Sequence, residues 1–173
     1  MNNLMIDLET MGTGNNSAIV AIGAAYFDPL TAELGGTYYT AVDLQSNLDC
    51  GLQVDGDTVM WWMSQSDDAR AALQGGIKLP EMLRDFSRWC GASGNPKSVW
   101  SHATFDHVIL MNAYEKAGVP SPFHYRAAKD IRTLSYLASP NDVMFVGEQH
   151  NALDDAVHQV KYVSKMIQEI KNG

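Results

Sequence analysis

Two carboxylates lie two residues apart within a short apolar run near the N-terminus. The run is Leu4 to Glu9, and its acidic members are Asp7 and Glu9. Apolar residues followed by a turn-forming segment predict a β-strand, in which alternate side chains point to the same face. The two carboxylates then share one face, about 6.6 Å apart along the chain. Burying such a pair is costly, so the strand either borders solvent or offers its oxygens to a divalent cation.

The rest of the chain predicts two further early strands and then mainly helices. Ser17 to Phe27 is rich in Ala, Ile and Val and predicts a buried strand, and Gly36 to Val42 predicts a third. Because short turns join these strands, we expect an antiparallel meander. Helices are expected at residues 57–63 (capped by Asp57), 66–73, 79–89, 104–117 and 151–171, with a strand at 97–101, a short strand and helix within 123–137, and a loop opening at 139–141. The order predicts an α/β fold with a mixed sheet flanked by helices.

Length and composition favour one globular domain. A chain of 173 residues predicts a single domain, residues 1–173, and 46 % apolar with 18 % charged residues excludes a disordered or fibrous chain. The net charge of −8 argues against a broad basic face for DNA. Cys50 and Cys90 form no zinc-binding spacing and favour a reduced compartment. The apolar run Ala18 to Phe27 is too short to cross a membrane, so we expect a soluble cytoplasmic protein with no membrane partner.

Further acidic residues stand where the predicted fold gathers functional groups. Asp106 lies where the fourth strand passes into a helix, although an Asp in the first turn of a helix is also favoured by the helix dipole. The last helix is preceded by His150 and opens with Asn151 as a predicted N-cap. With that cap, Asp154 has a capping pattern. His150 and Asp155 can share a site only if His150 lies outside the helix, as the cap predicts. Periodicity does not choose between Asp154 and Asp155 as a ligand.

Together these segments supply four carboxylates and a histidine. Such a set is what two divalent ions about 4 Å apart require. In phosphoryl chemistry one ion activates the attacking water and the other stabilises the departing oxygen. The sequence therefore predicts a two-metal site for phosphoryl transfer.

Three motifs in this order resemble those of the DEDDh exonucleases. They are Ile6-Asp7-Leu8-Glu9-Thr10 followed by Gly12, then Phe105-Asp106, then His150-x-Ala152-x-x-Asp155. Two further stretches are similar to a branch of small stand-alone phage and bacterial exonucleases, namely Thr58-Val59-Met60-Trp61-Trp62 with Gln65, and Asp130-Ile131-Arg132-Thr133-Leu134. The resemblance implies a ribonuclease H-like fold with a mixed five-stranded sheet.

The resemblance also implies a function. It implies 3′–5′ hydrolysis of single-stranded DNA or RNA, from a free 3′ end, to nucleoside monophosphates. It assigns two Mg²⁺ or Mn²⁺ ions per site and four carboxylate ligands, which are Asp7, Glu9, Asp106 and Asp155. It makes His150 the general base, a role that suits a near-neutral pKa. It implies contacts to the terminal nucleotide from Thr10, Met11, Gly12 and Phe105, and it suggests a homodimer.

Several aromatic and basic side chains keep two interpretations. Trp61 and Trp62 either stack on bases or pack in the core or at a dimer interface. As neighbours on a helix they point about 100° apart, so we expect at most one to face a given groove. Arg126, Lys129 and Arg132 either contact phosphates or pair with nearby acids, and the resemblance favours a structural role for Arg132.

Other positions near the motifs are open in the same way. Phe105 either stacks on a base or fills the core, and we favour the core. His102 is either a substrate contact or a surface residue, and we favour the surface. His102 stands where similar sequences carry small or amide residues, and Met11 where they carry a second Thr or a similar residue. Asp154 keeps its capping interpretation, and the loop of residues 139–149 delivers His150.

Two other functions compete with the exonuclease. A nuclease-like module could bind nucleic acid or a partner without cutting. A site that has lost its catalytic activity, however, has no need of all four carboxylates. A hydrolase of short oligonucleotides would keep the metal site. The net charge of −8 favours this second rival, because long strands need extended phosphate contacts.

Overall fold

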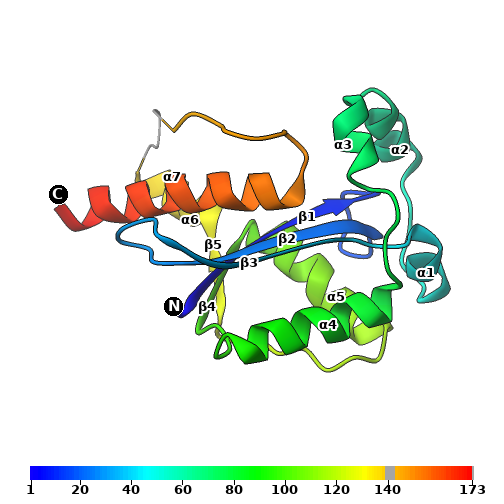
Figure 1. Cartoon of the computed structure of the whole chain (residues 1–173), viewed down its shortest axis with the longest axis horizontal. Helices are drawn as coiled ribbons and strands as arrows, with labels where there is room; N and C mark the ends of the chain where they lie inside the picture. The colour runs from blue at the N-terminus through cyan, green and yellow to red at the C-terminus, as the bar shows by residue number, and fades with distance from the viewer. Residues whose placement is uncertain (139–142, 173) are drawn as a thin grey trace.

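The computed structural model describes residues 1–138 and 143–172, which are built around a five-stranded sheet (Figure 1). The strands are β1 (Asn3–Thr10), β2 (Ile19–Phe27), β3 (Leu34–Ala41), β4 (Ser98–Ser101) and β5 (Ala128–Asp130), in the order β3-β2-β1-β4-β5. The first three form an antiparallel meander, and β4 and β5 run parallel to β1. The expected mixed sheet is confirmed, and the strand with Asp7 and Glu9 is its centre.

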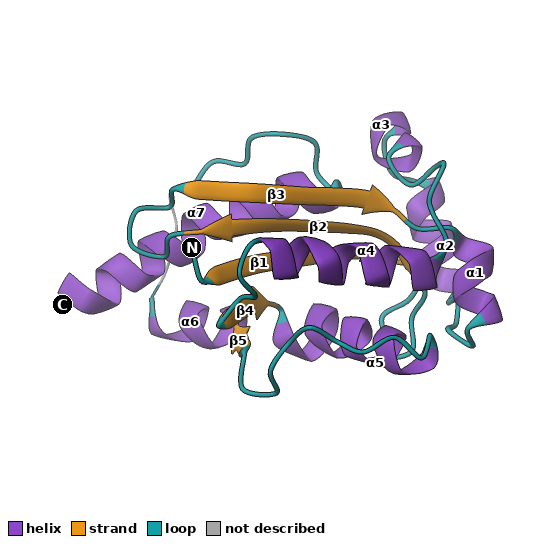
Figure 2. Ribbon diagram, turned by 60° about the horizontal axis from the view of Figure 1, so that its bottom comes forward, coloured by secondary structure: helices purple, strands orange, loops and turns teal. Residues whose placement is uncertain are grey.

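Helices cover both faces of the sheet. One face is crossed by α7 (Ala152–Asn172), and the other carries α4 (Leu79–Ala92) and α5 (Val108–Lys116), as Figures 1 and 2 show. The shorter helices are α1 (Leu44–Asp49), α2 (Gly56–Met63), α3 (Asp67–Ala71), the π-helical turn η1 (Ala103–His107) and α6 (Ile131–Leu137). No helix in the described ranges is both long enough and apolar enough to span a bilayer.

Alternation along β1 decides which layer each of its side chains joins. Leu4, Ile6 and Leu8 pack into the larger core with α4 and α5. Met5 points the other way, into a smaller core beneath α7. Asp7 and Glu9 follow Met5 at intervals of two and therefore share its face. The acidic end of β1 thus faces the layer that contains α7.

A glycine lets α7 come close to the sheet. Gly23 of β2 is the register partner of Asp7. A Cβ atom at Gly23 would lie 2.1 Å from the backbone carbonyl carbon of Ala152, the first residue of α7. Gly within a strand often marks such a close approach of backbone. The first turn of α7 therefore rests directly on β2, beside Asp7.

Local structure differs from expectation at helix starts. The helix α1, capped by Asp43, was not expected, because its six residues are too short for apolar periodicity to show. The N-cap of α2 is Asp55, whose carboxylate accepts the N–H of Asp57 at 3.0 Å, so the expected Asp57 cap is wrong. Residues 104–107 of the expected helix 104–117 belong instead to the π-helical turn η1. The loop expected to open at 139–141 lies outside the described residues.

Candidate active site

Acidic and histidine side chains from separate elements meet at the carboxyl end of β1. They form two groups, Asp7, His102 and Asp106 in one, and Glu9, His150 and Asp155 in the other. Within each group, one ligand atom from each residue lies within 4.8 Å of the others. The structure thus brings together the five residues that the motifs named, and it adds His102 to them.

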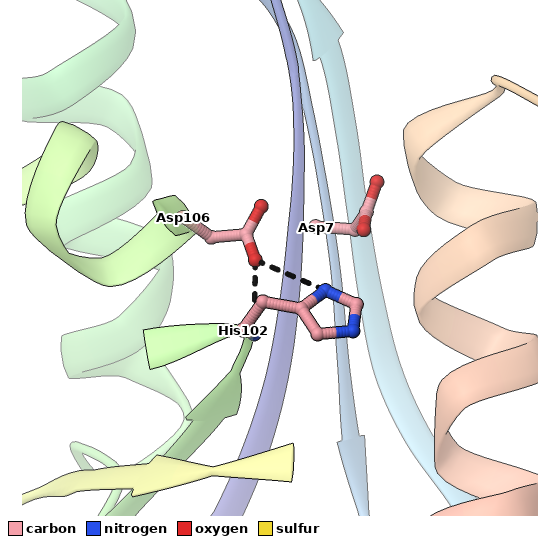
Figure 3. A group of neighbouring side chains, drawn as sticks. All are labelled: Asp7, His102 and Asp106. Atoms are coloured by element: carbon pink, nitrogen blue, oxygen red, sulfur yellow. Dashed lines mark hydrogen bonds and ion pairs between the residues drawn. The ribbon is translucent and has the colours of Figure 1, made fainter. Parts of the chain in front are cut away.

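Asp106 is held by backbone donors. Its side chain is buried, its Oδ1 accepts the N–H of Leu8 at 3.2 Å, and its Oδ2 accepts the N–H of His102 at 3.0 Å. Turns of the π type occur frequently at functional sites. Here η1 places the Asp106 carboxylate beside β1, where it points toward Asp7 (Figure 3).

Asp7 is held from the opposite side by α7. The Nε2 of Gln159 donates a hydrogen bond of 2.6 Å to the Asp7 Oδ1. Gln159 lies four residues after Asp155, so the two share one side of the helix. The motifs did not name Gln159. Its i,i+4 relation to Asp155 on a predicted helix was the signal that could have found it.

The carboxylates repel one another. Burial raises the pKa of Asp7 well above its usual value, and the charges of Asp106, Glu9 and Asp155 raise that pKa further. Burial, and then the charges of Asp155 and Asp106, raises the pKa of Glu9 to about 8. Burial also raises the pKa of Asp106 to about 7, against the effect of its backbone donors. Divalent cations relieve such repulsion, because each neutralises two carboxylates, and oxygen donors suit them.

His150 lies just outside α7, as predicted. Its backbone is left-handed, with φ of 66°, and its N–H donates a 2.9 Å hydrogen bond to Oδ2 of Asp155. Its ring stands edge-on to Trp61, with centroids 4.9 Å apart. Asn151 caps α7 as expected, because its Oδ1 accepts the N–H of Leu153 at 3.1 Å. These contacts fix the imidazole beside the carboxylates of its group.

Asp154 does not complete the capping pattern that was expected of it. Its Oδ2 accepts the N–H of Glu148 at 2.9 Å, so it holds the loop before His150 instead of the start of its own helix. Glu148 also accepts a 2.7 Å hydrogen bond from the hydroxyl of Ser66, the N-cap of α3. Gly147 has φ of 124°, and a Cβ there would lie 2.6 Å from the Asp154 carboxyl carbon. The end of the loop is thus tied to both α7 and α3.

A cavity of about 540 Å³ opens beside Glu9. Its lining includes Thr10, Gly12, Trp61, Trp62 and Phe105. Both tryptophans therefore border one cavity, and the expectation that only one would do so is wrong, because side chains of this length reach across the angle between them. The buried Trp62 is fixed by its Nε1, which donates a 2.9 Å hydrogen bond to the carbonyl oxygen of Thr10.

Two predicted contact residues pack against the larger core. Phe105 is half-buried and contributes to both the core and the cavity wall. Met11 packs against the core and is not part of that wall. The cavity therefore combines three of the expected nucleotide contacts with the two tryptophans.

His102 is not the surface residue that we favoured. It is half-buried, and its Nδ1 lies 3.7 Å from Oδ2 of Asp106. The basic residues are engaged with groups of their own chain. Arg132 donates a 3.1 Å hydrogen bond to Oγ1 of Thr104, and the Lys129 ammonium donates to the carbonyl oxygens of the three preceding residues.

Solved structures share this fold. The nuclease domain of 3′hExo, a DEDDh family member bound to rAMP, matches with a TM-score of 0.66 and 14 % identity, over 96 % of this chain and 92 % of that one. A 3′-exonuclease that recognises the 3′ end of a histone mRNA stem-loop matches with a TM-score of 0.62 and 13 % identity, over 96 % and 81 %. The zinc-bound E. coli exonuclease I complex with single-stranded DNA matches with a TM-score of 0.62 and 13 % identity, over 98 % and 40 %.

A family model identifies the chain more directly. No curated protein matches the sequence. Residues 2–167, however, match the family described as the 3′-5′ exoribonuclease Rv2179c-like domain, which covers nearly the whole chain. The ribonuclease H-like fold of DEDDh exonucleases and the three ordered motifs agree with that match. The chain therefore belongs to the Rv2179c-like 3′-5′ exoribonuclease domain family and is a 3′–5′ exonuclease.

Proposed function

We propose that this protein, acting as one domain over residues 1–173, removes nucleotides singly from the free 3′ end of single-stranded DNA or RNA. It does so with two divalent cations and with His150 as general base. One observation carries the proposal. Two groups, each made of two carboxylates and one histidine, stand side by side next to a nucleotide-sized cavity.

The cavity supports binding of the terminal nucleotide. Trp61, Trp62 and Phe105 offer aromatic surface, and stacking on such side chains accepts any base. Thr10 and Gly12 lie at the end of β1, directly after Glu9. A nucleotide in this cavity therefore presents its phosphate to the carboxylates. The nuclease domain of 3′hExo with bound rAMP and the exonuclease I complex with single-stranded DNA are consistent with such a ligand.

The carboxylates support two divalent cations, Mg²⁺ or Mn²⁺. The ligands would be Asp7, Glu9, Asp106 and Asp155, whose pKa values are raised chiefly by burial. Repulsion from the other carboxylates of the site raises the pKa values of Asp7 and Glu9 further. When bound, such cations lower the pKa of water and stabilise charge on the departing oxygen. Backbone donors orient Asp106, and Gln159 orients Asp7, so the oxygens are already in place.

The position of His150 supports proton transfer. Its imidazole stands beside Glu9 and Asp155, where an attacking water would approach the phosphate bound in the cavity. The water oxygen forms a bond to phosphorus and gives its proton to the imidazole. The bond from phosphorus to the 3′ oxygen of the preceding nucleotide breaks, which releases a nucleoside 5′-monophosphate. An imidazole suits this role at neutral pH.

A gel assay tests the proposal. Single-stranded DNA and RNA of one sequence, labelled at the 5′ end, are incubated with Mg²⁺, Mn²⁺ or EDTA. We expect a ladder that shortens from the 3′ end only with cation, while a circular strand stays intact. Asp7→Asn and Asp155→Asn should stop the shortening with the fold preserved. His150→Ala should keep cation binding and lose most of the rate. Strands that remain full-length with every cation would contradict the proposal.

Short oligonucleotides are a second candidate substrate. The net charge is −8, and Lys129 and Arg132 are engaged with groups of their own chain. A long strand gains affinity mainly from phosphate contacts, which need such basic groups. Comparison of kcat/KM for a dinucleotide and a 20-nucleotide strand decides between the two substrates.

A further inference from the structure

His102 joins the group of Asp7 and Asp106 although no exonuclease motif includes it. The residue immediately precedes η1, and its Nδ1 lies 3.7 Å from Oδ2 of Asp106. In Figure 3 its imidazole points toward the space that the two carboxylates also face. Three donor groups, one nitrogen and two carboxylates, therefore converge at one place.

The contact between His102 and Asp106 is not a hydrogen bond. A separation of 3.7 Å is too long for an N–H···O hydrogen bond. The nearer oxygen, Oδ2, already accepts the backbone N–H of His102 at 3.0 Å. Among residues 1–138 and 143–172, no group forms a hydrogen bond with the imidazole. The ring is therefore held beside the carboxylates with its nitrogens available to a ligand.

The spacing fits a shared cation. Donor atoms that bind the same ion at about 2.1 Å lie roughly 3 to 4 Å apart, which the 3.7 Å between Nδ1 and Oδ2 satisfies. The group is half-buried to buried, so few waters compete for the ion. Its two carboxylates provide the charge that a divalent cation needs, and the imidazole adds a neutral nitrogen.

We propose that His102 is a ligand of one of the two divalent cations, together with Asp7 and Asp106. The inference rests on the proposed function, because it concerns the same metal site. It adds a consequence for the choice of metal. Imidazole nitrogen suits Zn²⁺, Ni²⁺ and similar ions, whereas Mg²⁺ prefers oxygen ligands alone. This position should thus favour transition-metal ions over Mg²⁺, while the group of Glu9 and Asp155, with His150 acting as base, should show no such preference.

The test detects the nitrogen directly. Mn²⁺-loaded protein is examined by electron spin echo envelope modulation, which reports a ¹⁴N nucleus bound to the ion, and cation affinity is measured by titration calorimetry. We expect wild type to show ¹⁴N modulation and His102→Ala to lose it. Loss of an outer-shell partner alone weakens metal binding about 10- to 100-fold. Loss of a ligand should therefore weaken binding of one Mn²⁺ and one Zn²⁺ by at least about tenfold.

Two variants make the result specific. In His102→Asn an amide oxygen stands near the place of Nδ1, so this variant should retain Mg²⁺ affinity and lose the ¹⁴N modulation. His158→Ala removes a histidine of α7 that is outside both groups and should leave the modulation unchanged. Thermal melts of each variant establish that the fold is retained.

The outcomes separate this inference from the proposed function. Unchanged ¹⁴N modulation in both His102 variants overturns the inference, as does modulation that disappears only in His150→Ala. Either result leaves the proposed exonuclease function unaffected if the wild-type protein still binds two cations and shortens strands. A wild-type protein that binds no divalent cation overturns the proposed function itself.

Discussion

Gln159 on α7 donates a 2.6 Å hydrogen bond to Asp7 on β1, which joins two residues that are far apart in the sequence. The bond lowers the pKa of Asp7 against the stronger effects of burial and of three neighbouring carboxylates. It also ties the helix that carries Asp155 to the strand that carries Glu9. A glutamine outside the exonuclease motifs therefore orients the centre of the site.

Replacement of Gln159 should weaken cation binding more than it weakens the fold. Gln159→Leu keeps the size of the side chain but removes the donor, so the Asp7 carboxylate loses its orienting partner. We expect kcat/KM to fall about 10- to 100-fold, the range typical of residues that orient metal ligands. Gln168→Leu, at an exposed position of the same helix, should have little effect. Equal rates for the two variants would remove Gln159 from the site.

Gly23→Ala should separate α7 from the sheet. The added Cβ would lie 2.1 Å from the backbone of Ala152, so the first turn of the helix must move. Overpacking of this kind costs about 1–3 kcal/mol of stability. Because the same turn carries Asp155, we expect turnover to fall far more than that loss of stability explains.

The matched control for this variant is Gly36→Ala in β3, where the nearest atom would lie at 3.8 Å. Activity and melting temperature are measured on both proteins. A Gly23→Ala enzyme with wild-type kcat would show that the position of α7 tolerates the shift.

In EDTA, the stability of the protein should depend on the protonation of Glu9. Its pKa is about 8 in the folded chain, above the usual value near 4.5, so the folded state binds more protons between these values. This group therefore contributes stability at low pH that is lost as the pH rises toward 8. His102, His107 and His158 act in the opposite sense, because burial lowers their pKa values.

The variant Glu9→Gln separates the contribution of this carboxylate to the pH dependence of stability from that of the histidines. Its melting temperature in EDTA, relative to wild type, should increase from pH 5 to pH 8, because only wild type acquires the charge of Glu9, while Asp7 and Asp106 ionise in both proteins. Mn²⁺ should stabilise wild type most at pH 8 and should stabilise Glu9→Gln less. A difference in melting temperature between the two proteins that stays constant with pH would mean that Glu9 has its usual pKa in the folded protein.

Neighbouring acids at the start of α7 should behave differently when removed. Asp155 accepts the N–H of His150 and lies in a metal group, whereas Asp154 accepts the N–H of Glu148. We expect Asp155→Ala to abolish turnover and to weaken cation binding. Asp154→Ala should release the loop before His150, lower kcat by about tenfold and leave cation affinity unchanged. The reverse pattern would transfer the ligand role to Asp154.

The two tryptophans should separate binding from stability. Trp61 is 43 % exposed at the cavity, whereas Trp62 is 4 % exposed and donates a hydrogen bond to Thr10. Stacking on an aromatic side chain contributes about 1–3 kcal/mol per base, so Trp61→Ala should raise KM about tenfold. Trp62→Ala should lower the melting temperature as well, because it removes a buried side chain. A KM unaffected by Trp61→Ala would place the base elsewhere.

The sequence predicted what depends on local pattern. The alternation of Leu4, Ile6 and Leu8 with Asp7 and Glu9 placed both carboxylates on one face before any tertiary contact was known. The Asn151 cap correctly put His150 outside α7. Family motifs then selected a set of residues, and the structure brings that set together.

The contacts that periodicity missed depend on packing between distant segments. Nothing near Gly23 indicates that a helix begun at residue 152 will touch it. In the same way, His102 looked like a surface residue because Asp7, which belongs to the same group, lies on a strand almost a hundred residues earlier in the chain. The role of Asp154 was missed because a capping pattern describes one helix, and its actual partner, Glu148, belongs to the loop before it.

The residues of the site lie in regions that differ in local stability. Asp7 and Glu9 alternate with core residues on the central strand, so they stay in place as long as the sheet exists. Asp155 and His150 stand at the end of a helix, where fraying costs far less than global unfolding. We therefore expect the contact between the first turn of α7 and β2 to break at a lower cost than global unfolding, and such opening would remove Asp155 and His150 from the site. Amide hydrogens near residue 150 should exchange with solvent much faster than that of Leu8. Bound cations should reduce this difference in exchange rate.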